Sequence, residues 1–367
     1  MNPIIVVKIG SSSLTSPGGG LHRESIDFFA KELVSLKQAG YAVMLVTSGA
    51  VAAGFRSIGY AQRPKHLHEK QAAAAVGQAL LMQAYNEAFS QYDHRVAQLL
   101  LTRPDFSNRK RINNALMTIE ELLKQNVIPI INENDTVAVD ELKFSENDTL
   151  SALVANVVKA YKLLIVTDMD GLYTADPRKN AEAIKIERVD QINEQIFRIA
   201  GGAGSSVGTG GMRSKIEAAR IATRGGIPVF IGQANTPGDL LTAVQGTGKG
   251  TYFETILHTL SMKKQWVGFH SSPTGTIIVD DGAKRALLNG GKSLLPVGVR
   301  EVIGEFHPGD VVEVIGTERQ PIGRGVVNYA SWQLTAVAGL SLDEVQKRVE
   351  VIRPEVIHRD EWVSSEG

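Results

Sequence analysis

Short runs of apolar, often β-branched residues alternate with longer amphipathic stretches through the first two thirds of the chain. Continuously apolar runs predict strands that are buried on both faces, and apolar positions spaced three and four apart predict helices. The alternation is typical of an α/β fold in which a mainly parallel central sheet is sandwiched between helical layers. The predicted strands are 4–9, 42–47, 95–101, 127–132, 162–167 and 227–232, and the predicted helices are 23–38, 71–92, 108–125, 150–160 and 212–223.

The pattern changes near residue 250, where helical stretches give way to short strands separated by Gly, Pro and Asp turns. A second, β-rich domain is therefore expected, with strands in GTIIVDD (275–281), KSLLPVGV (292–299), GDVVEVIG (309–316) and GRGVVNY (323–329). We expect a catalytic domain at 1–258, a linker at 259–272, the small β-rich domain at 273–351 and a C-terminal tail at 352–367.

Composition narrows the class of protein. The 367 residues contain 39 Lys and Arg against 39 Asp and Glu, a balance that disfavours a protein gripping nucleic acid through its phosphates. The sequence has no cysteine, which excludes thiol nucleophiles, disulfides and thiolate metal sites. It shows neither a signal-peptide pattern nor an apolar run of membrane-spanning length. We expect a cytoplasmic enzyme that makes no membrane contact.

The densest cluster of glycine lies between Gly201 and Lys215, where GGAGSSVGTGGMRSK leads into a helical run. Glycines let bare backbone N–H groups approach an anion, and a helix N-terminus followed by Lys215 adds positive charge. The segment therefore predicts a phosphate cradle, with a flexible surface loop as the alternative. Its spacing fits neither of the common nucleotide fingerprints.

Polar residues follow the predicted strands, where ligands bind in open α/β sheets. Lys8 lies in an apolar strand and needs an anion there, unless it reaches solvent at a sheet edge. Ser48 and the amides after it suit a carboxylate, or simply cap a helix. Asp135 and the pair Asn147–Asp148 suit an ammonium group, lysines or Mg²⁺; the alternatives are turn chemistry and, for Asp148, a helix cap. Together these groups favour phosphoryl transfer.

Six segments in order carry a family resemblance: KIGS (8–11), VTSGAVAAG (46–54), NEND (132–135), NDTLSA (147–152), TDMDGLYTADPR (167–178) and GTGGMRSK (208–215). They resemble the amino acid kinase superfamily, in particular its glutamate kinases, and the β-rich end resembles the PUA domain, an RNA-associated module. The resemblance spans nearly the whole chain. It implies transfer of the γ-phosphate of ATP, as its Mg²⁺ complex, to the side-chain carboxylate of L-glutamate, giving glutamyl 5-phosphate in the first step of proline synthesis.

The resemblance also implies roles on the phosphate side. Lys8 and Lys215 match the pair that stabilises the migrating phosphate, and Asp148 matches the acid that holds these lysines in place. Arg213 stands where many relatives have a smaller polar residue, a difference that would alter nucleotide contacts and leaves the family assignment unchanged. The implied ATP-binding residues are Lys8, Thr167, Asp168, Thr209, Gly210, Gly211, Met212, Arg213, Ser214 and Lys215.

On the substrate side, Ser48, Asp135 and Asn147 match the glutamate site of the family. A glutamate side chain has an unperturbed pKa of about 4.3, so the nucleophile is already deprotonated at neutral pH and needs no general base. The obstacle is repulsion between a carboxylate and a polyanion, which two ammonium groups offset. Asp135 is a suitable partner for the α-ammonium of the substrate, and Asp148 is better suited to organise lysines than to act as a base.

The resemblance further implies feedback inhibition by proline, a homo-oligomer, and a possible hand-off of the acyl phosphate to glutamyl 5-phosphate reductase. One alternative is another kinase of the superfamily, acting on acetylglutamate, carbamate or a nucleoside monophosphate. A second is an RNA-binding regulator that acts through the C-terminal domain. Between residues 273 and 351, however, there are eight Lys and Arg and ten Asp and Glu, and this negative balance disfavours tight binding to the phosphate backbone of RNA.

Overall fold

The computed structural model of the 367-residue chain describes residues 2–16, 18–138, 147–177, 180, 182–200, 211–255, 273–288, 291–349 and 353–365. The chain divides into two compact units. The first consists of residues 1–105 and 109–259, and the second of residues 106–108 and 260–367.

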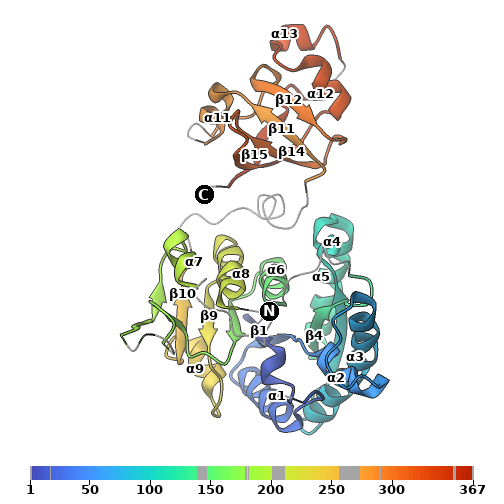
Figure 1. The fold of residues 1–367 in the computed structure, drawn as a ribbon, viewed down its shortest axis with the longest axis vertical. Helices are drawn as coiled ribbons and strands as arrows, with labels where there is room; N and C mark the ends of the chain where they lie inside the picture. Colours follow the sequence, from blue (N-terminus) through green and yellow to red (C-terminus); the bar gives the residue numbers. More distant parts are fainter. Residues whose placement is uncertain are drawn as a thin grey trace. The chain divides into compact units, whose positions relative to one another are not determined.

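The first unit is built on an eight-stranded sheet in the order β3-β4-β2-β1-β5-β9-β10-β8 (Figure 1). Neighbouring strands pair in parallel, except that β10 runs antiparallel to β9. The expectation of a mainly parallel sheet is therefore confirmed. The strands are β1 (Ile4–Ile9), β2 (Ala42–Val46), β3 (Val96–Leu101), β4 (Ile128–Glu133), β5 (Lys162–Val166), β8 (Arg188–Val189), β9 (Val229–Gly232) and β10 (Gly250–Phe253), and β6 (Leu172–Tyr173) pairs with β7 (Lys185–Ile186) in a separate hairpin.

The helices of this unit lie close to the predicted positions, with differences at their ends. The helix predicted from residue 71 begins four residues earlier, and the helix predicted from 150 begins at Asn147. Residues 103–107, ahead of the helix predicted from 108, form a short helix of their own. The helices are α1 (Arg23–Gln38), α2 (Ala50–Gly54), α3 (Leu67–Ser90), α4 (Arg103–Ser107), α5 (Arg109–Lys124), α6 (Asn147–Val157), α7 (Glu194–Ala200), α8 (Met212–Arg224) and α9 (Asp239–Gln245).

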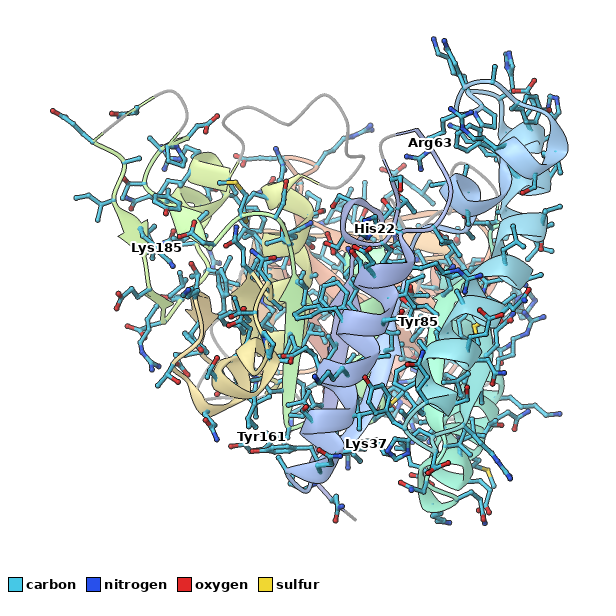
Figure 2. All side chains as sticks on the ribbon, turned by 90° about the horizontal axis from the view of Figure 1, so that it is seen from below. His22, Lys37, Arg63, Tyr85, Tyr161 and Lys185 are labelled. Atoms are coloured by element: carbon cyan, nitrogen blue, oxygen red, sulfur yellow. The ribbon has the colours of Figure 1, made fainter. Side chains whose placement is uncertain are left out.

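The two faces of β1 lead to different layers. Ile5, Val7 and Ile9 belong to a core that also contains apolar side chains of α1, α3 and α9. Tyr85 of α3 lies in this core beside α1, with its hydroxyl 2.8 Å from Thr47 Oγ1 (Figure 2). Because successive side chains of a strand point to opposite faces, Lys8 points to the other side of the sheet. There α6 packs against β1, β4 and β5, and α8 packs against α6.

The second unit is a five-stranded sheet in the order β12-β11-β13-β14-β15, covered by apolar residues of its helices. The strand predicted at 292–299 is wrong in position: Pro296–Gly298 form a 3-10 turn, and the strand follows it. Strand β15 lies in the segment assigned to a tail and pairs with β14, so the sheet extends past residue 351. The elements are β11 (Gly275–Val279), α11 (Asp281–Leu288), β12 (Val299–Ile303), β13 (Val311–Ile315), β14 (Pro321–Val327), α12 (Ser331–Val337), α13 (Leu342–Val345) and β15 (Ile357–Ser364).

Candidate active site

The sequence-predicted polar residues gather at one edge of the sheet of the first unit. The chain runs from β1 to β2 on one side and returns to β5 on the other, so that β1 lies where the strand order reverses. The carboxyl ends of strands at such a reversal are the usual ligand site of open α/β sheets. Lys8 lies near the end of β1, Ser48 follows β2, Asn132 lies near the end of β4, and Thr167 follows β5.

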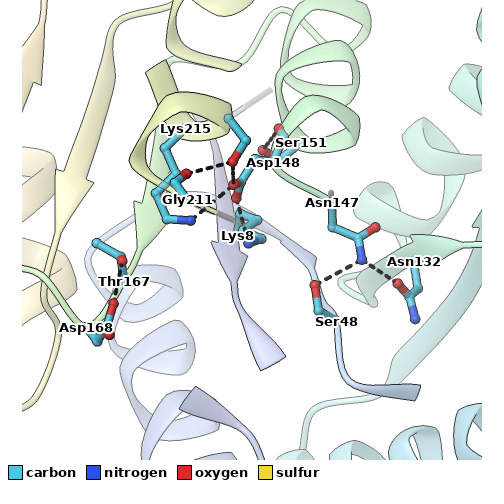
Figure 3. A network of polar contacts seen from close by, with 11 residues as sticks. Lys8, Ser48, Asn132, Asn147, Asp148, Ser151, Thr167, Asp168, Gly211 and Lys215 are labelled. Atoms are coloured by element: carbon cyan, nitrogen blue, oxygen red, sulfur yellow. Dashed lines mark hydrogen bonds and ion pairs between the residues drawn. The ribbon is translucent and has the colours of Figure 1, made fainter. Parts of the chain in front are cut away.

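Two lysines from distant parts of the sequence meet on one carboxylate (Figure 3). Lys8 Nζ lies 2.6 Å from Asp148 Oδ1, and Lys215 Nζ lies 3.1 Å from Asp148 Oδ2. The hydroxyl of Ser214 donates to the same Oδ2 at 2.9 Å. The three charged residues are buried, with 5% of Lys8, 0% of Asp148 and 6% of Lys215 exposed. We call these three residues the ionic cluster.

Two helix starts position this ionic cluster. Asp148 is the second residue of α6, so it lies inside the first turn and its carboxylate faces the lysines. Helix α8 begins after Gly211, which has an extended backbone, and Ser214 Oγ also lies 2.9 Å from the Gly211 carbonyl oxygen. Lys215 therefore projects from the first turn of α8, where the helix dipole adds positive potential.

Opposing effects set the charge state of Asp148. Burial by itself would raise the pKa of this carboxyl, but the charges of Lys8 and Lys215 and hydrogen bonds from Lys8 and Ser214 hold its pKa well below the usual range. Asp148 is therefore ionised at neutral pH, and the ionic cluster carries one net positive charge. Because each carboxylate oxygen already faces an ammonium group, Asp148 is badly placed to accept a proton from a ligand.

A second group of polar side chains lies beside the ionic cluster and carries no charge (Figure 3). Asn147 Nδ2 donates to Ser48 Oγ at 2.9 Å and to Asn132 Oδ1 at 3.0 Å. Asn132 Nδ2 in turn donates to Gln78 Oε1 at 2.9 Å. The backbone N–H of Glu133 donates to Asn132 Oδ1 at 2.9 Å and to Asn147 Oδ1 at 3.3 Å. We call Ser48, Gln78, Asn132 and Asn147 the amide cluster.

Those of the remaining predicted residues that the structure describes lie just after β4 and β5 and at the start of α8. Thr167 follows β5, with Thr167 Oγ1 3.0 Å from Asp168 Oδ1, and Gln233 Nε2 donates to the Asp168 carbonyl at 2.6 Å. Met212 begins α8, Arg213 beside it is exposed, and Asp135 is half-buried in the turn after β4. The predicted ATP residues Thr209 and Gly210 lie outside the described residues.

Sequence reasoning assigned no role to two members of the amide cluster. Asn132 closes the apolar run IPIIN, and a polar residue at a strand end is a recognisable signal. Gln78 lies inside the long helix α3 between small and apolar residues, and nothing in the local pattern marks it. Its neighbourhood depends on the packing of α3 against the sheet.

No described helix has the length and apolar character needed to cross a membrane. In the described part of the chain, no group of three or more His, Asp or Glu side chains could hold a metal ion.

Comparisons with known proteins show the family to which the chain belongs. Residues 3–233 match the Amino acid kinase family, and residues 275–349 match the PUA domain. The chain is 50% identical over 361 residues to "Glutamate 5-kinase" of Geobacillus kaustophilus (strain HTA426), covering 98% of this chain and 96% of that protein. It is 48% identical to "Glutamate 5-kinase" of Bacillus cereus (strain B4264), covering 98% of both.

Among solved structures, a carbamate kinase from Giardia lamblia bound to AMP-PNP matches with a TM-score of 0.51. The match covers 70% of this chain and 99% of that one. Its sequence identity is 16%, so this likeness bears on the fold alone.

Proposed function

The chain belongs to the amino acid kinase family and carries a PUA domain, and from that premise we propose that it is a glutamate 5-kinase. It transfers the γ-phosphoryl group of ATP to the side-chain carboxylate of L-glutamate, the first step of proline biosynthesis. The observation that carries the proposal is the pair of lysines held on Asp148, directly beside an uncharged cluster suited to a carboxylic substrate.

The reaction requires positioning and charge neutralisation more than proton transfer. A carboxylate oxygen of glutamate attacks the γ-phosphorus, a new P–O bond forms, and the bond to the β-phosphate oxygen breaks. The products are ADP and glutamyl 5-phosphate. Because the side-chain carboxyl of glutamate has an unperturbed pKa of about 4.3, the nucleophile is ionised without any general base. This fits an Asp148 whose oxygens already face two lysines.

We assign Lys8 and Lys215 to stabilise the transferring phosphoryl group and its leaving oxygen. An ammonium group about 4 Å from a unit negative charge contributes about 4 kcal/mol at an effective dielectric constant of about 20. Asp148 aligns both ammonium groups before the substrates arrive, so the charges do not need to reorganise during the reaction. The net positive charge of the ionic cluster then meets the triphosphate.

We assign Ser48 and Asn147 to the bound glutamate, and Asp135 to its α-ammonium group. A charge-assisted contact to Asp135 would separate glutamate from acetylglutamate, which has no free ammonium group. Mg²⁺ enters with ATP as part of the substrate complex. Mg²⁺ is commonly held by substrate phosphates, waters and one or two carboxylates, so the proposed reaction requires no dedicated metal site in the protein.

A coupled assay of ADP release tests the proposed function, with glutamate, acetylglutamate, aspartate and carbamate as acceptors. Glutamate is expected to give the highest kcat/KM. Turnover with acetylglutamate or carbamate in the absence of activity on glutamate would overturn the assignment. Adding proline to the same assay tests feedback inhibition, which stays a prediction. Four other expectations also stay predictions: the homo-oligomer, the cytoplasmic location, the hand-off to glutamyl 5-phosphate reductase, and any binding of RNA by the C-terminal domain.

A further inference from the structure

We propose that Gln78 is a positioning residue for the acceptor substrate. It orients the amide of Asn132 and, through Asn147, makes the Ser48 hydroxyl a hydrogen-bond donor toward an anionic group. The inference rests on the proposed function in one respect only, namely that the acceptor substrate binds at Ser48. Gln78 itself is placed behind the site and acts through other side chains.

The direction of every hydrogen bond in the amide cluster follows from one backbone group. The N–H of Glu133 can only donate, so the Asn132 atom that faces it at 2.9 Å must be the oxygen, Oδ1. The other end of that amide, Nδ2, must then donate, and its partner at 2.9 Å must be an acceptor. Gln78 meets this requirement with Oε1 and turns its own Nε2 away.

The same logic continues to Ser48. Asn132 Oδ1 already accepts from the Glu133 N–H, and it also accepts from Asn147 Nδ2 at 3.0 Å. The second hydrogen of Asn147 Nδ2 goes to Ser48 Oγ at 2.9 Å, so this hydroxyl accepts. Its own hydrogen is used in no hydrogen bond within the described part of the chain. A hydroxyl polarised in this way is ready to donate to a carboxylate or a phosphoryl oxygen.

This orientation is energetically unfavourable for the Gln78 side chain itself. Its side chain is buried, with 9% of the residue exposed, and Nε2 has no hydrogen-bond partner among the described residues. A buried donor without a partner destabilises the folded protein. A free glutamine would turn its amide to avoid that cost, but turning it would set Nε2 against the donor Nδ2 of Asn132. The need of Asn132 for an acceptor therefore decides the orientation.

Helix α3 is well placed to couple Gln78 to Ser48 by a second route. A Cβ on Gly77, the residue before Gln78, would lie 1.8 Å from the Ala50 carbonyl oxygen, and a Cβ on Gly54 would lie 2.1 Å from the Ala73 carbonyl oxygen. This close approach presses α3 against α2, which begins two residues after Ser48. The helix that holds the Asn132 amide thus also holds the loop that carries Ser48.

The test compares Gln78→Met, which removes the acceptor at similar length, with Gln83→Met on the exposed side of the same helix. In Gln78→Met the KM for glutamate is expected to rise about tenfold, whereas kcat and the KM for ATP change less than about twofold. Gln83→Met is expected to match the wild type. Equal changes in both KM values, or no change in either, would overturn the proposal.

A double-mutant cycle separates positioning from a general packing defect. Asn132→Ala already breaks the path from Gln78 to Ser48, so adding Gln78→Met to it is expected to raise the glutamate KM less than about twofold further. Additive effects would mean that Gln78 does not act through Asn132, and would overturn the proposal.

Two further measurements cover other failures. If Gln78→Met does not fold, the neutral variant Gln78→Leu also removes the acceptor and is expected to raise the glutamate KM about tenfold with the KM for ATP changed less than about twofold, whereas equal changes in both would overturn the proposal. If the wild-type protein turns over another acceptor instead of glutamate, the proposed function fails. In that case, the role of Gln78 is tested separately: Gln78→Met should raise the KM of that acceptor and leave the KM for ATP nearly unchanged.

Discussion

The two clusters of the site stabilise buried polar groups in different ways. In the ionic cluster, three full charges are buried, and both ammonium groups lie 2.6–3.1 Å from the one carboxylate. In the amide cluster, neutral groups are held at similar distances, and their arrangement depends on which atom donates and which accepts. The ionic cluster supplies positive charge, whereas the amide cluster fixes which groups donate and which accept hydrogen bonds.

This difference teaches which changes each side tolerates. Removing Asp148 from the ionic cluster leaves two buried ammonium groups without a counter-ion, which is strongly destabilising. Removing one amide leaves a neutral donor or acceptor without a partner, which costs less and can be relieved by rotation or by water. Mutations on the ionic side should therefore act on kcat and on folding, and those on the amide side mainly on the KM of the acceptor.

Asp148→Asn is expected to have the largest effect. It leaves Lys8 and Lys215 buried without their counter-ion, which costs about 3–5 kcal/mol of unfolding free energy. It also frees both ammonium groups from their alignment, so kcat of the folded fraction should fall by about a hundredfold or more. Chemical denaturation and single-turnover assays measure the two effects, with the exposed Asp27→Asn as control. Normal stability with normal kcat would contradict the account of the ionic cluster.

The pH dependence of stability also tests the pairing of Asp148 with the two lysines. Because the lysines hold the pKa of Asp148 below its usual value of about 3.9, this carboxylate stabilises the folded state above about pH 4. That stabilisation is lost as the pH falls through the lowered pKa. The variant Asp148→Asn lacks it at every pH, so the gap in unfolding free energy between wild type and variant should narrow below about pH 4. A gap that stays constant down to pH 2 would contradict the pairing.

Lys215→Met ranks next, because it removes one of the two proposed phosphate-stabilising charges and leaves Asp148 paired with Lys8. Loss of one such group typically lowers kcat by about 10²–10³. The KM for glutamate should change little, since the amide cluster stays intact. Steady-state kinetics beside the exposed-lysine variant Lys31→Met would reveal the split. A rise in the glutamate KM with unchanged kcat would mean that the two clusters do not divide the work in this way.

Asp135→Ala is expected to act on the substrate side. Loss of a charge-assisted contact to the α-ammonium group corresponds to a rise in the glutamate KM of about tenfold or more, with the KM for ATP nearly unchanged. The exposed Thr136→Ala, one residue further along the same turn, serves as the control. Equal shifts in both KM values would argue against the assigned pocket.

Gly77→Ala tests the packing that supports the amide cluster, and we expect the smallest effect on catalysis here. The added methyl would meet the Ala50 carbonyl, so α2 and α3 must separate, at a cost of about 1–3 kcal/mol in unfolding free energy. The shift should also raise the glutamate KM, because α2 follows Ser48. Thermal melting and kinetics measure both, with the exposed Ala79→Ser as control. An unchanged melting temperature would show that the helices have room to spare.

Much of the molecule could be predicted from local sequence. Apolar runs such as IIVVKI and KLLIVT determined buried parallel strands, because only a strand covered on both faces accommodates uninterrupted apolar residues. The 3-10 turn at Pro296–Gly298 misled the strand prediction because a short apolar run containing proline fits either structure.

The sequence by itself determined which residue types are present and where they lie along the chain. These are a lysine that needs an anion, acids and amides at strand ends, and the alternation that places those ends on one edge of a sheet. Only the tertiary structure decided the partnerships. Lys8 and Lys215 lie 207 positions apart and meet because α6 and α8 pack on the face of the sheet toward which Lys8 points. Gln78 carries no local signal, since the direction of a hydrogen bond is set by groups that folding brings from elsewhere in the chain.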